Sequence, residues 1–351
     1  MKNLILFCIM NLEVIMKTLS LVVDMNGCPN RCKHCWLGHM PNYKMDETCD
    51  EFIINYFKPY FENITYYSWL REPDYCKNYK ERWIKDNKIS INLKPMRFEL
   101  ASFYMIVRDS NYVNFLKEVN VNTVQLTLFG LEDLTDKYVG RKGAYQEIIQ
   151  ATNLLIENNI NVRWQAFINE ENKEEIVQLL DVIEELKLKE RCKDFKFFVH
   201  EGSCDGENSK LYSIRIQKDN IPQNLMPYYL GYDELLEEKE CIELLNESNE
   251  KVNYEIPNHL VLNISNTYDV YFNFTHISEE WKIGNLKEID SKELVRRIVE
   301  KDTFAYNHMN ITYRELTNKY GDIISTKVFS LGDYKSYLFN QYLKEIYNQG
   351  E

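Results

Sequence analysis

Apolar and polar positions alternate in a regular order along the first 200 residues. Runs typical of buried strands occur at 18–24, 64–70, 98–102, 123–128, 161–168 and 195–199. Helical periodicity separates several of them, at 46–57, 111–119, 143–158 and 173–187. Strands that alternate with helices favour a parallel sheet, and six repeats before residue 200 predict an α/β fold with a partial (β/α)6 TIM-type barrel. In such folds the reactive site lies at the carboxyl ends of the strands.

The chain beyond residue 205 follows a different pattern. An acidic helix is predicted at 232–249, a hairpin at 260–274, and helices at 291–299 and 334–347. We therefore expect three parts: a barrel core at 17–205, a variable connecting region at 206–258, and a small α+β C-terminal extension at 259–351.

Composition and charge narrow the class of protein. The 351 residues carry a net charge of -12, which argues against a protein that wraps a nucleic acid backbone. No run approaches the roughly 18 apolar residues that span a bilayer, so no membrane partner is expected. In the opening segment 1–16, the polar residues Asn3, Asn11 and Glu13 interrupt the apolar run, and no signal-peptide cleavage site follows. The sequence therefore argues against secretion. Translation starting at Met16 is an alternative. Cysteines without a disulfide pattern favour the reducing cytoplasm.

Three cysteines follow the first predicted strand in one tight loop. Cys28, Cys32 and Cys35 have the spacing C-x3-C-x2-C. Three thiolates do not close a metal site, because tetrahedral zinc needs four ligands and a [4Fe-4S] cluster on three cysteines leaves one iron open to another molecule. A zinc loop with His34 or His39 as the fourth ligand is the alternative.

This loop resembles the signature of the radical S-adenosylmethionine (SAM) superfamily. The resemblance implies a [4Fe-4S] cluster on the three cysteines, with SAM chelating the open iron through its amino and carboxylate groups. Electron transfer then cleaves SAM to a 5'-deoxyadenosyl radical that abstracts hydrogen from substrate. His34 stands where the superfamily usually has an aromatic residue, and a backbone contact of His34 to adenine is implied.

Other parts of the SAM site follow from the same resemblance. Glu72-Pro73 matches the end of the superfamily's Gly-Gly-Glu-Pro motif, with Leu70 and Arg71 replacing the glycines. Glu72 is therefore expected to bind the SAM amino group, although a solvated turn is the alternative. By resemblance Thr127 contacts the SAM ribose and Arg141 the SAM carboxylate.

Four more residues are candidates because of their places at strand ends. Ser102 and Gln165 are polar side chains on predicted strands, and polar groups of SAM or substrate satisfy them as well as a neighbouring strand does. His200 is predicted to position substrate or move protons, and Cys204 to donate a hydrogen atom to a substrate radical. A satisfied loop histidine and an inert cysteine are the alternatives.

The C-terminal pattern bears on the substrate. The hairpin and Gly284-Asn285-Leu286 resemble the SPASM/twitch extension of many radical SAM enzymes, but no cysteine follows Cys241, so an extension without auxiliary clusters is predicted. Such an ending favours a peptide substrate. Only 27 residues precede Cys28, too few for a leader-peptide-binding domain, so a small metabolite is an equal alternative. The expected electron donor is a flavodoxin or ferredoxin. A non-catalytic metal-binding or regulatory protein on a decayed radical SAM barrel is the competing hypothesis.

Overall fold

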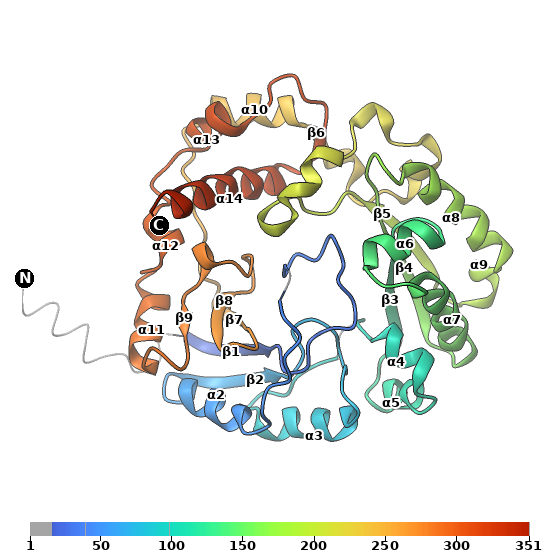
Figure 1. Cartoon of the computed structure of the whole chain (residues 1–351), viewed down its shortest axis with the longest axis horizontal. Coiled ribbons are helices and arrows are strands. Elements are labelled where there is room, and N and C mark those ends of the chain that lie inside the picture. The colour runs from blue at the N-terminus through green and yellow to red at the C-terminus, as the bar shows by residue number, and fades with distance from the viewer. Residues whose placement is uncertain (1–15, 39, 98, 351) are drawn as a thin grey trace, which may run out of the picture. The chain divides into compact units, whose positions relative to one another are not determined.

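The computed structural model describes residues 16–38, 40–97 and 99–350, which form two compact units (Figure 1). Each unit gathers segments that are far apart in sequence. Unit 1 contains the described residues up to Cys28 together with Met40–Met96 and Asn253–Met309, and unit 2 those of Pro29–His39, Arg97–Val252 and Asn310–Glu351. The three parts expected from sequence do not coincide with these units, and that division stays a prediction.

Unit 1 is built on a five-stranded mixed sheet of order β2-β1-β7-β8-β9. Its strands are β1 (Met16–Val23), β2 (Phe61–Tyr67), β7 (His259–Ile264), β8 (Asp269–Phe272) and β9 (Gly284–Asn285). β1 is parallel to both β2 and β7, whereas β8 and β9 add antiparallel pairs. The predicted hairpin is therefore confirmed, and its first strand also pairs with the N-terminal strand of the chain.

One face of this sheet forms an apolar core. Alternate residues of β1, namely Leu19, Leu21 and Val23, are fully buried, because strand side chains point to opposite faces in turn. Helices with apolar stripes pack in the same cluster. The helical elements of unit 1 are α2 (Cys49–Phe57), α3 (Tyr79–Ile89), η5 (Glu279–Trp281), α11 (Ser291–Val299) and α12 (Phe304–Asn307).

Unit 2 is built on a parallel sheet of order β3-β4-β5. The strands are β3 (Thr123–Leu128), β4 (Asn161–Phe167) and β5 (Lys196–His200), with α6 (Glu132–Val139), α7 (Ala144–Glu157), α8 (Lys173–Glu185) and α9 (Leu188–Arg191) in the connections (Figure 1). Trp164 of β4 is fully buried, and its indole N–H donates to Thr152 Oγ1 of α7 at 2.9 Å. The helices thus cover the apolar face of the sheet, and its polar positions lie on the other face.

Further elements complete unit 2. Before β3 come α4 (Phe103–Arg108) and α5 (Tyr112–Glu118). After β5 the chain forms η1 (Gly206–Ile214), η2 (Lys218–Asn220), η3 (Gln223–Tyr228), η4 (Tyr232–Glu234), β6 (Leu236–Glu237), α10 (Glu238–Glu247), α13 (Tyr313–Tyr320), β10 (Val328–Phe329) and α14 (Leu331–Gly350). The two short strands β6 and β10 pair antiparallel.

The predicted α/β class is confirmed, but one predicted strand is wrong. Residues 99–102 form no strand, and Ser102 instead caps α4, where its hydroxyl accepts from the Met105 N–H at 3.2 Å. A serine before an apolar run is a strong helix start, and this outweighs the strand propensity of the segment. The parallel strands of the described residues lie in two sheets, so the partial barrel stays a prediction.

Two expectations concern the membrane and the N-terminus. Among the residues that the structure describes, no helix is both long and apolar enough to cross a bilayer. The opening segment 1–15, considered above as a secretion signal, lies outside the described residues.

Candidate functional site: the cysteine loop and the pocket beside it

The part of the cysteine loop that follows Cys28 belongs to unit 2 and is bound to the end of α6. The Arg31 N–H donates to Val139 O at 2.9 Å, and the Lys33 N–H to Tyr138 O at 2.8 Å. Gly140, which ends α6 with φ of 72°, makes this approach possible, because a Cβ at this position would lie 2.7 Å from Arg31 O. The backbone on both sides of Cys32, the second predicted cluster ligand, is therefore held by a helix end.

Arg141, the residue after Gly140, forms a hydrogen bond with the same loop. Its Nε donates to Asn30 Oδ1 at 2.9 Å, and its Nη1 to Glu147 Oε1 at 2.8 Å. Burial would raise the pKa of Glu147, but the hydrogen bonds from Arg108 and Arg141 lower it, so this carboxylate stays ionised. Arg141 is thus already paired with a carboxylate of the protein, and its contact with the SAM carboxylate remains a proposal.

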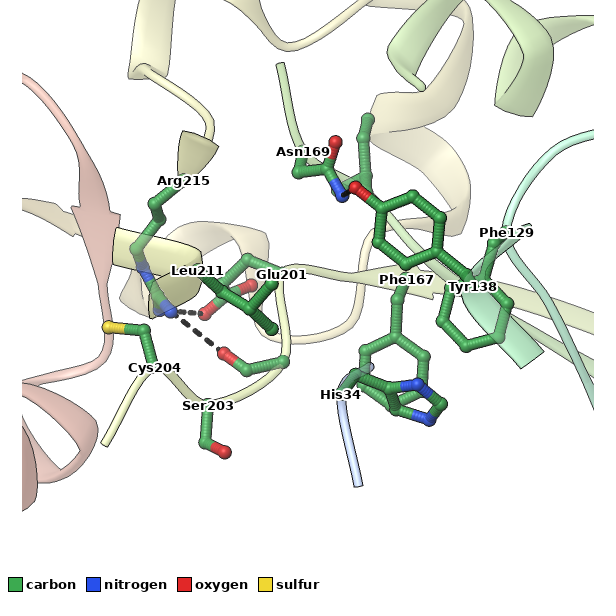
Figure 2. Close-up of a pocket in the computed structure, with 12 residues that line it drawn as sticks. His34, Phe129, Tyr138, Phe167, Asn169, Glu201, Ser203, Cys204, Leu211 and Arg215 are labelled. Carbon is green, nitrogen blue, oxygen red and sulfur yellow. Dashed lines mark hydrogen bonds and ion pairs between the residues drawn. The ribbon is translucent and has the colours of Figure 1, made fainter. Parts of the chain in front are cut away.

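A pocket opens at the carboxyl ends of all three strands of the unit 2 sheet (Figure 2). It encloses about 370 Å³ of space, part of it open to solvent. Its walls come from the strand ends, from α6 and η1, and from the cysteine loop: His34, Phe129, Tyr138, Phe167, Ile168, Asn169, Glu201, Gly202, Ser203, Cys204, Leu211 and Arg215. The expected position of the site at the strand ends agrees with this arrangement.

His34 lies among aromatic rings in this pocket. Its ring centroid is 4.3 Å from that of Phe129 and 4.4 Å from that of Phe167 (Figure 2). Burial and the neighbouring His200 lower the pKa of His34 to about 3, so the imidazole is neutral at pH 7. Its Nδ1 is buried and makes no hydrogen bond with any described residue. Zinc ligation by His34 would require the ring to leave these contacts, and His39 lies outside the described residues.

The opposite wall of the pocket carries a buried ion pair. Arg215 Nη2 lies 3.3 Å from Glu201 Oε1, and Arg215 Nη1 donates to Gly202 O at 2.8 Å (Figure 2). The Tyr229 hydroxyl donates to Glu201 Oε2 at 2.9 Å. Cys204 beside this pair is buried, which raises the pKa of its thiol to about 12 and keeps the S–H intact at neutral pH.

A polar row runs across the sheet face that the helices leave uncovered. Arg163 donates a hydrogen bond to Gln125 Oε1. The side-chain amide of Gln125 donates in turn to Gln165 Oε1. The side-chain amide nitrogen of Gln165 is hydrogen-bonded to His200 Nε2. Thr127 is the register partner of Gln165 on this face. Burial and Arg215 lower the pKa of His200 to about 4, so at pH 7 any contribution to proton transfer uses the neutral ring.

Glu72 belongs to a separate group of charged residues in unit 1. Its Oε2 lies 3.8 Å from Cys28 Sγ, which places the predicted SAM ligand beside the first predicted cluster ligand. The preceding residue, Arg71, forms an ion pair with Asp24.

Sequence reasoning missed several pocket residues. Phe129, Phe167 and Asn169 were identifiable in principle, because they stand directly at or after strand ends. Arg215 carries no local signal, since it enters the pocket from the long connection after β5. Ser102 was placed for a wrong reason, because its predicted strand is absent and its hydroxyl caps a helix.

The chemistry of the three cysteines fits an iron-sulfur cluster. Cys28, Cys32 and Cys35 are all half-buried thiols without disulfides. Among the described residues no group of three His, Cys, Asp or Glu side chains is gathered as a metal site, so the assignment rests on donor type and sequence spacing.

A comparison with protein families identifies this region. Residues 22–183 match the family model described as the radical SAM superfamily. This part of the chain is a radical SAM domain. The superfamily predicted from the cysteine loop is confirmed, and its enzymes use a [4Fe-4S] cluster and SAM. The matched segment contains the cysteine loop, Glu72 and the first two strands of the unit 2 sheet.

Individual relatives agree with the domain. The chain is 31% identical over 99 residues to Fe-coproporphyrin III synthase of Methanosarcina barkeri. That match covers 28% of this chain and spans about a quarter, 25%, of the curated relative.

Two solved structures share the fold over nearly the whole chain. They are native anSMEcpe with bound AdoMet and Kp18Cys peptide (TM-score 0.54, 15% identity, 95% of this chain and 99% of that chain) and native anSMEcpe with bound AdoMet (TM-score 0.52, 15% identity, 94% and 99%). The fold likeness therefore extends beyond the radical SAM domain into the predicted C-terminal extension.

Proposed function

We propose that this chain is a radical SAM enzyme in which Cys28, Cys32 and Cys35 hold one [4Fe-4S] cluster. When bound, the cluster supplies an electron that cleaves SAM and starts hydrogen abstraction from substrate. The observation that carries the proposal is the pocket beside the cysteine loop, because His34 brings that loop directly into its wall. The partial (β/α)6 barrel remains part of this proposal.

The pocket is suited to an adenine ring. Phe129 and Phe167 are stacked with an interplanar angle of 9°, and each lies against His34. Phe167 is only half-buried, and its flat apolar ring can bind a base by stacking, whereas Phe129 is buried behind it. In the tautomer that carries its proton on Nε2, the unpartnered Nδ1 of neutral His34 accepts a hydrogen bond from an exocyclic amine such as that of adenine. The backbone carbonyl of His34 already accepts from Asn208 Nδ2 at 2.9 Å, so the side chain is the better assignment for this contact than the backbone predicted from sequence.

The remaining SAM contacts keep their predicted roles within the proposal. Glu72 binds the amino group and Arg141 the carboxylate, and both are supported by their closeness to the cysteine loop residues Cys28 and Asn30. Thr127 and Gln165 offer polar groups to ribose or substrate from the uncovered sheet face. Ser102 is the least supported member, since its hydroxyl serves a helix cap.

Substrate-side roles fall to His200 and Cys204. Cys204 lines the pocket as a protonated thiol, which is the form required of a hydrogen-atom donor. His200 positions substrate through a neutral ring that contacts Phe167 at 4.3 Å. A peptide or a small metabolite is the proposed substrate. Peptides should be tested first, because a solved structure of this fold contains one. A flavodoxin or ferredoxin is the proposed electron donor, and the cytoplasm the proposed location.

The experiment is anaerobic reconstitution of the full chain with iron and sulfide, followed by incubation with SAM and a strong reductant. We expect about four irons per chain, the content of one [4Fe-4S] cluster, and conversion of SAM to 5'-deoxyadenosine. About twice that iron would reveal an auxiliary cluster and contradict the single-cluster prediction. Zinc binding without SAM cleavage would instead support the non-catalytic metal-binding or regulatory alternative.

A further inference from the structure

Arg71 forms a buried ion pair at the end of β1. Its Nε donates to Asp24 Oδ1 at 3.0 Å and its Nη2 to Asp24 Oδ2 at 2.7 Å. The two side chains are 8% and 1% exposed. Asp24 is itself held by its N–H, which donates to Ile264 O of β7 at 2.9 Å. Two parallel hydrogen bonds to one carboxylate fix the guanidinium in position and orientation. Removal of either partner would leave a buried charge without compensation.

The other N–H groups of Arg71 bind the backbone that follows the cysteine loop. Nη1 donates to Met40 O at 2.8 Å, and Nη2 to Pro41 O at 3.1 Å. Asn266 Nδ2 also donates to Pro41 O, at 2.5 Å. The rigid ion pair therefore determines where the chain runs immediately before Asn42.

Asn42 carries this restraint to the first cysteine. Its Oδ1 accepts from the Cys28 N–H at 3.2 Å, and its Nδ2 donates to Cys28 O at 2.7 Å. One amide side chain thus binds both backbone groups of Cys28. Gly27 allows the approach, since its φ is 75° and a Cβ there would lie 2.5 Å from Asn42 Oδ1.

We propose that Asp24, Arg71 and Asn42 form a brace that positions Cys28 for the cluster. The inference rests on the proposed function and deepens it. It gives a reason for Arg71 in a motif that usually carries glycine, because the arginine here restrains the segment that holds a cluster ligand. The brace residues act through the Cys28 backbone and are positioning residues. Metal ligands depend on such outer contacts for their orientation, and loss of those contacts weakens metal binding.

The first test measures the brace in the full chain without metal. Hydrogen exchange of the Cys28 amide should be about tenfold faster in Asn42→Ala, because its acceptor is lost. The matched control is Asn63→Ala, which removes a half-buried asparagine of unit 1 that also donates to a backbone carbonyl, Lys17 O. Unchanged exchange at Cys28 in Asn42→Ala would overturn the brace.

The second test measures the cluster in reconstituted protein. Arg71→Lys keeps the charge but loses the planar fork, so both it and Asn42→Ala should release iron to a chelator roughly tenfold faster than the parent. Arg297→Lys, an ion-paired arginine of unit 1 that also donates to a backbone carbonyl, and Asn63→Ala should match the parent. The thermal midpoints separate this effect from a general loss of stability, since the Asn42 and Asn63 variants should melt together.

The outcomes separate the two levels of inference. Faster exchange at Cys28 with parental iron release would overturn the positioning of the cluster by the brace. A parent chain that assembles no iron-sulfur cluster would contradict the proposed function, whatever the exchange data show.

Discussion

Two strand-end regions of this molecule, one in each unit, have opposite chemistry. After β1 and β2 in unit 1, Arg71 and Asp24 form a charged, fully hydrogen-bonded group beside Glu72. After β3 to β5 in unit 2, the pocket wall around His34 is aromatic and uncharged, with the pKa of that histidine lowered to about 3. The same place in a parallel sheet therefore offers different chemistry according to its side chains. In the proposed function Glu72 binds the amino group of SAM, and the aromatic wall around His34 binds its neutral base.

The largest effect should come from the cysteines, which adjoin both regions in sequence. Cys28→Ala, Cys32→Ala or Cys35→Ala should abolish the broad iron-sulfur absorbance and SAM cleavage, because each thiolate is needed to hold an iron. Absorbance spectra and 5'-deoxyadenosine formation measure this, and Cys49→Ala, at a buried cysteine of α2, is the control for loss of a thiol as such. Full activity in any of the first three variants would remove the cluster assignment.

The charged region should discriminate between SAM and its nucleoside part. Glu72→Gln should weaken SAM binding roughly tenfold or more, because a charge-assisted hydrogen bond of about 1.5 to 3 kcal/mol is lost. Adenosine, which lacks the amino acid, should bind as it does to the parent. Equilibrium titration of cluster-loaded protein measures both, with Glu62→Gln at the other end of β2 as control. Parental SAM affinity in Glu72→Gln would mean that Arg71-Glu72-Pro73 is only a turn.

The aromatic region should not discriminate between SAM and adenosine, because both carry the same base. Phe167→Leu should weaken SAM and adenosine by similar factors, roughly three- to tenfold, because base stacking on an aromatic ring contributes about 1 to 3 kcal/mol and leucine restores part of the contact. Phe195→Leu is the matched control, since Phe195 contacts Trp164 and does not line the pocket. Selective loss of SAM binding alone would contradict the comparison.

The smallest effect is a pH dependence of stability. The unfolded chain protonates His34 near pH 6.5, but the folded chain only near pH 3, so the unfolded state binds more protons between these values. The free energy of unfolding should therefore fall as pH is lowered through this window, by at most roughly 1.4 kcal/mol per pH unit from this group. His34→Phe should reduce that slope in urea titrations at pH 7, 6 and 5. If the free energy of unfolding of His34→Phe depended on pH as strongly as that of the parent, the imidazole of His34 would be in contact with water and its pKa would not be lowered by burial.

Local patterns were sufficient for much of the fold. The predicted strand 123–128 coincides with β3, and the helix at 291–299 with α11, because side-chain periodicity and turn residues are short-range signals. The segment 98–102 was assigned wrongly, since strand propensity competed there with the Ser102 helix cap. Residues 64–70 were predicted three residues too late for β2, whose start at Phe61 follows a turn that the pattern did not indicate.

The sequence by itself was enough to predict the cluster ligands and to indicate the superfamily, because three cysteines in one loop carry their chemistry in their spacing. Only the tertiary structure decided that β7 pairs with β1, that Arg215 reaches the pocket, and that Asn42 binds the Cys28 backbone. These contacts join residues up to about 240 positions apart in the case of β1 and β7. Contacts between residues so far apart depend on how whole helices and strands pack. A local pattern of polar and apolar residues does not specify which distant elements will meet.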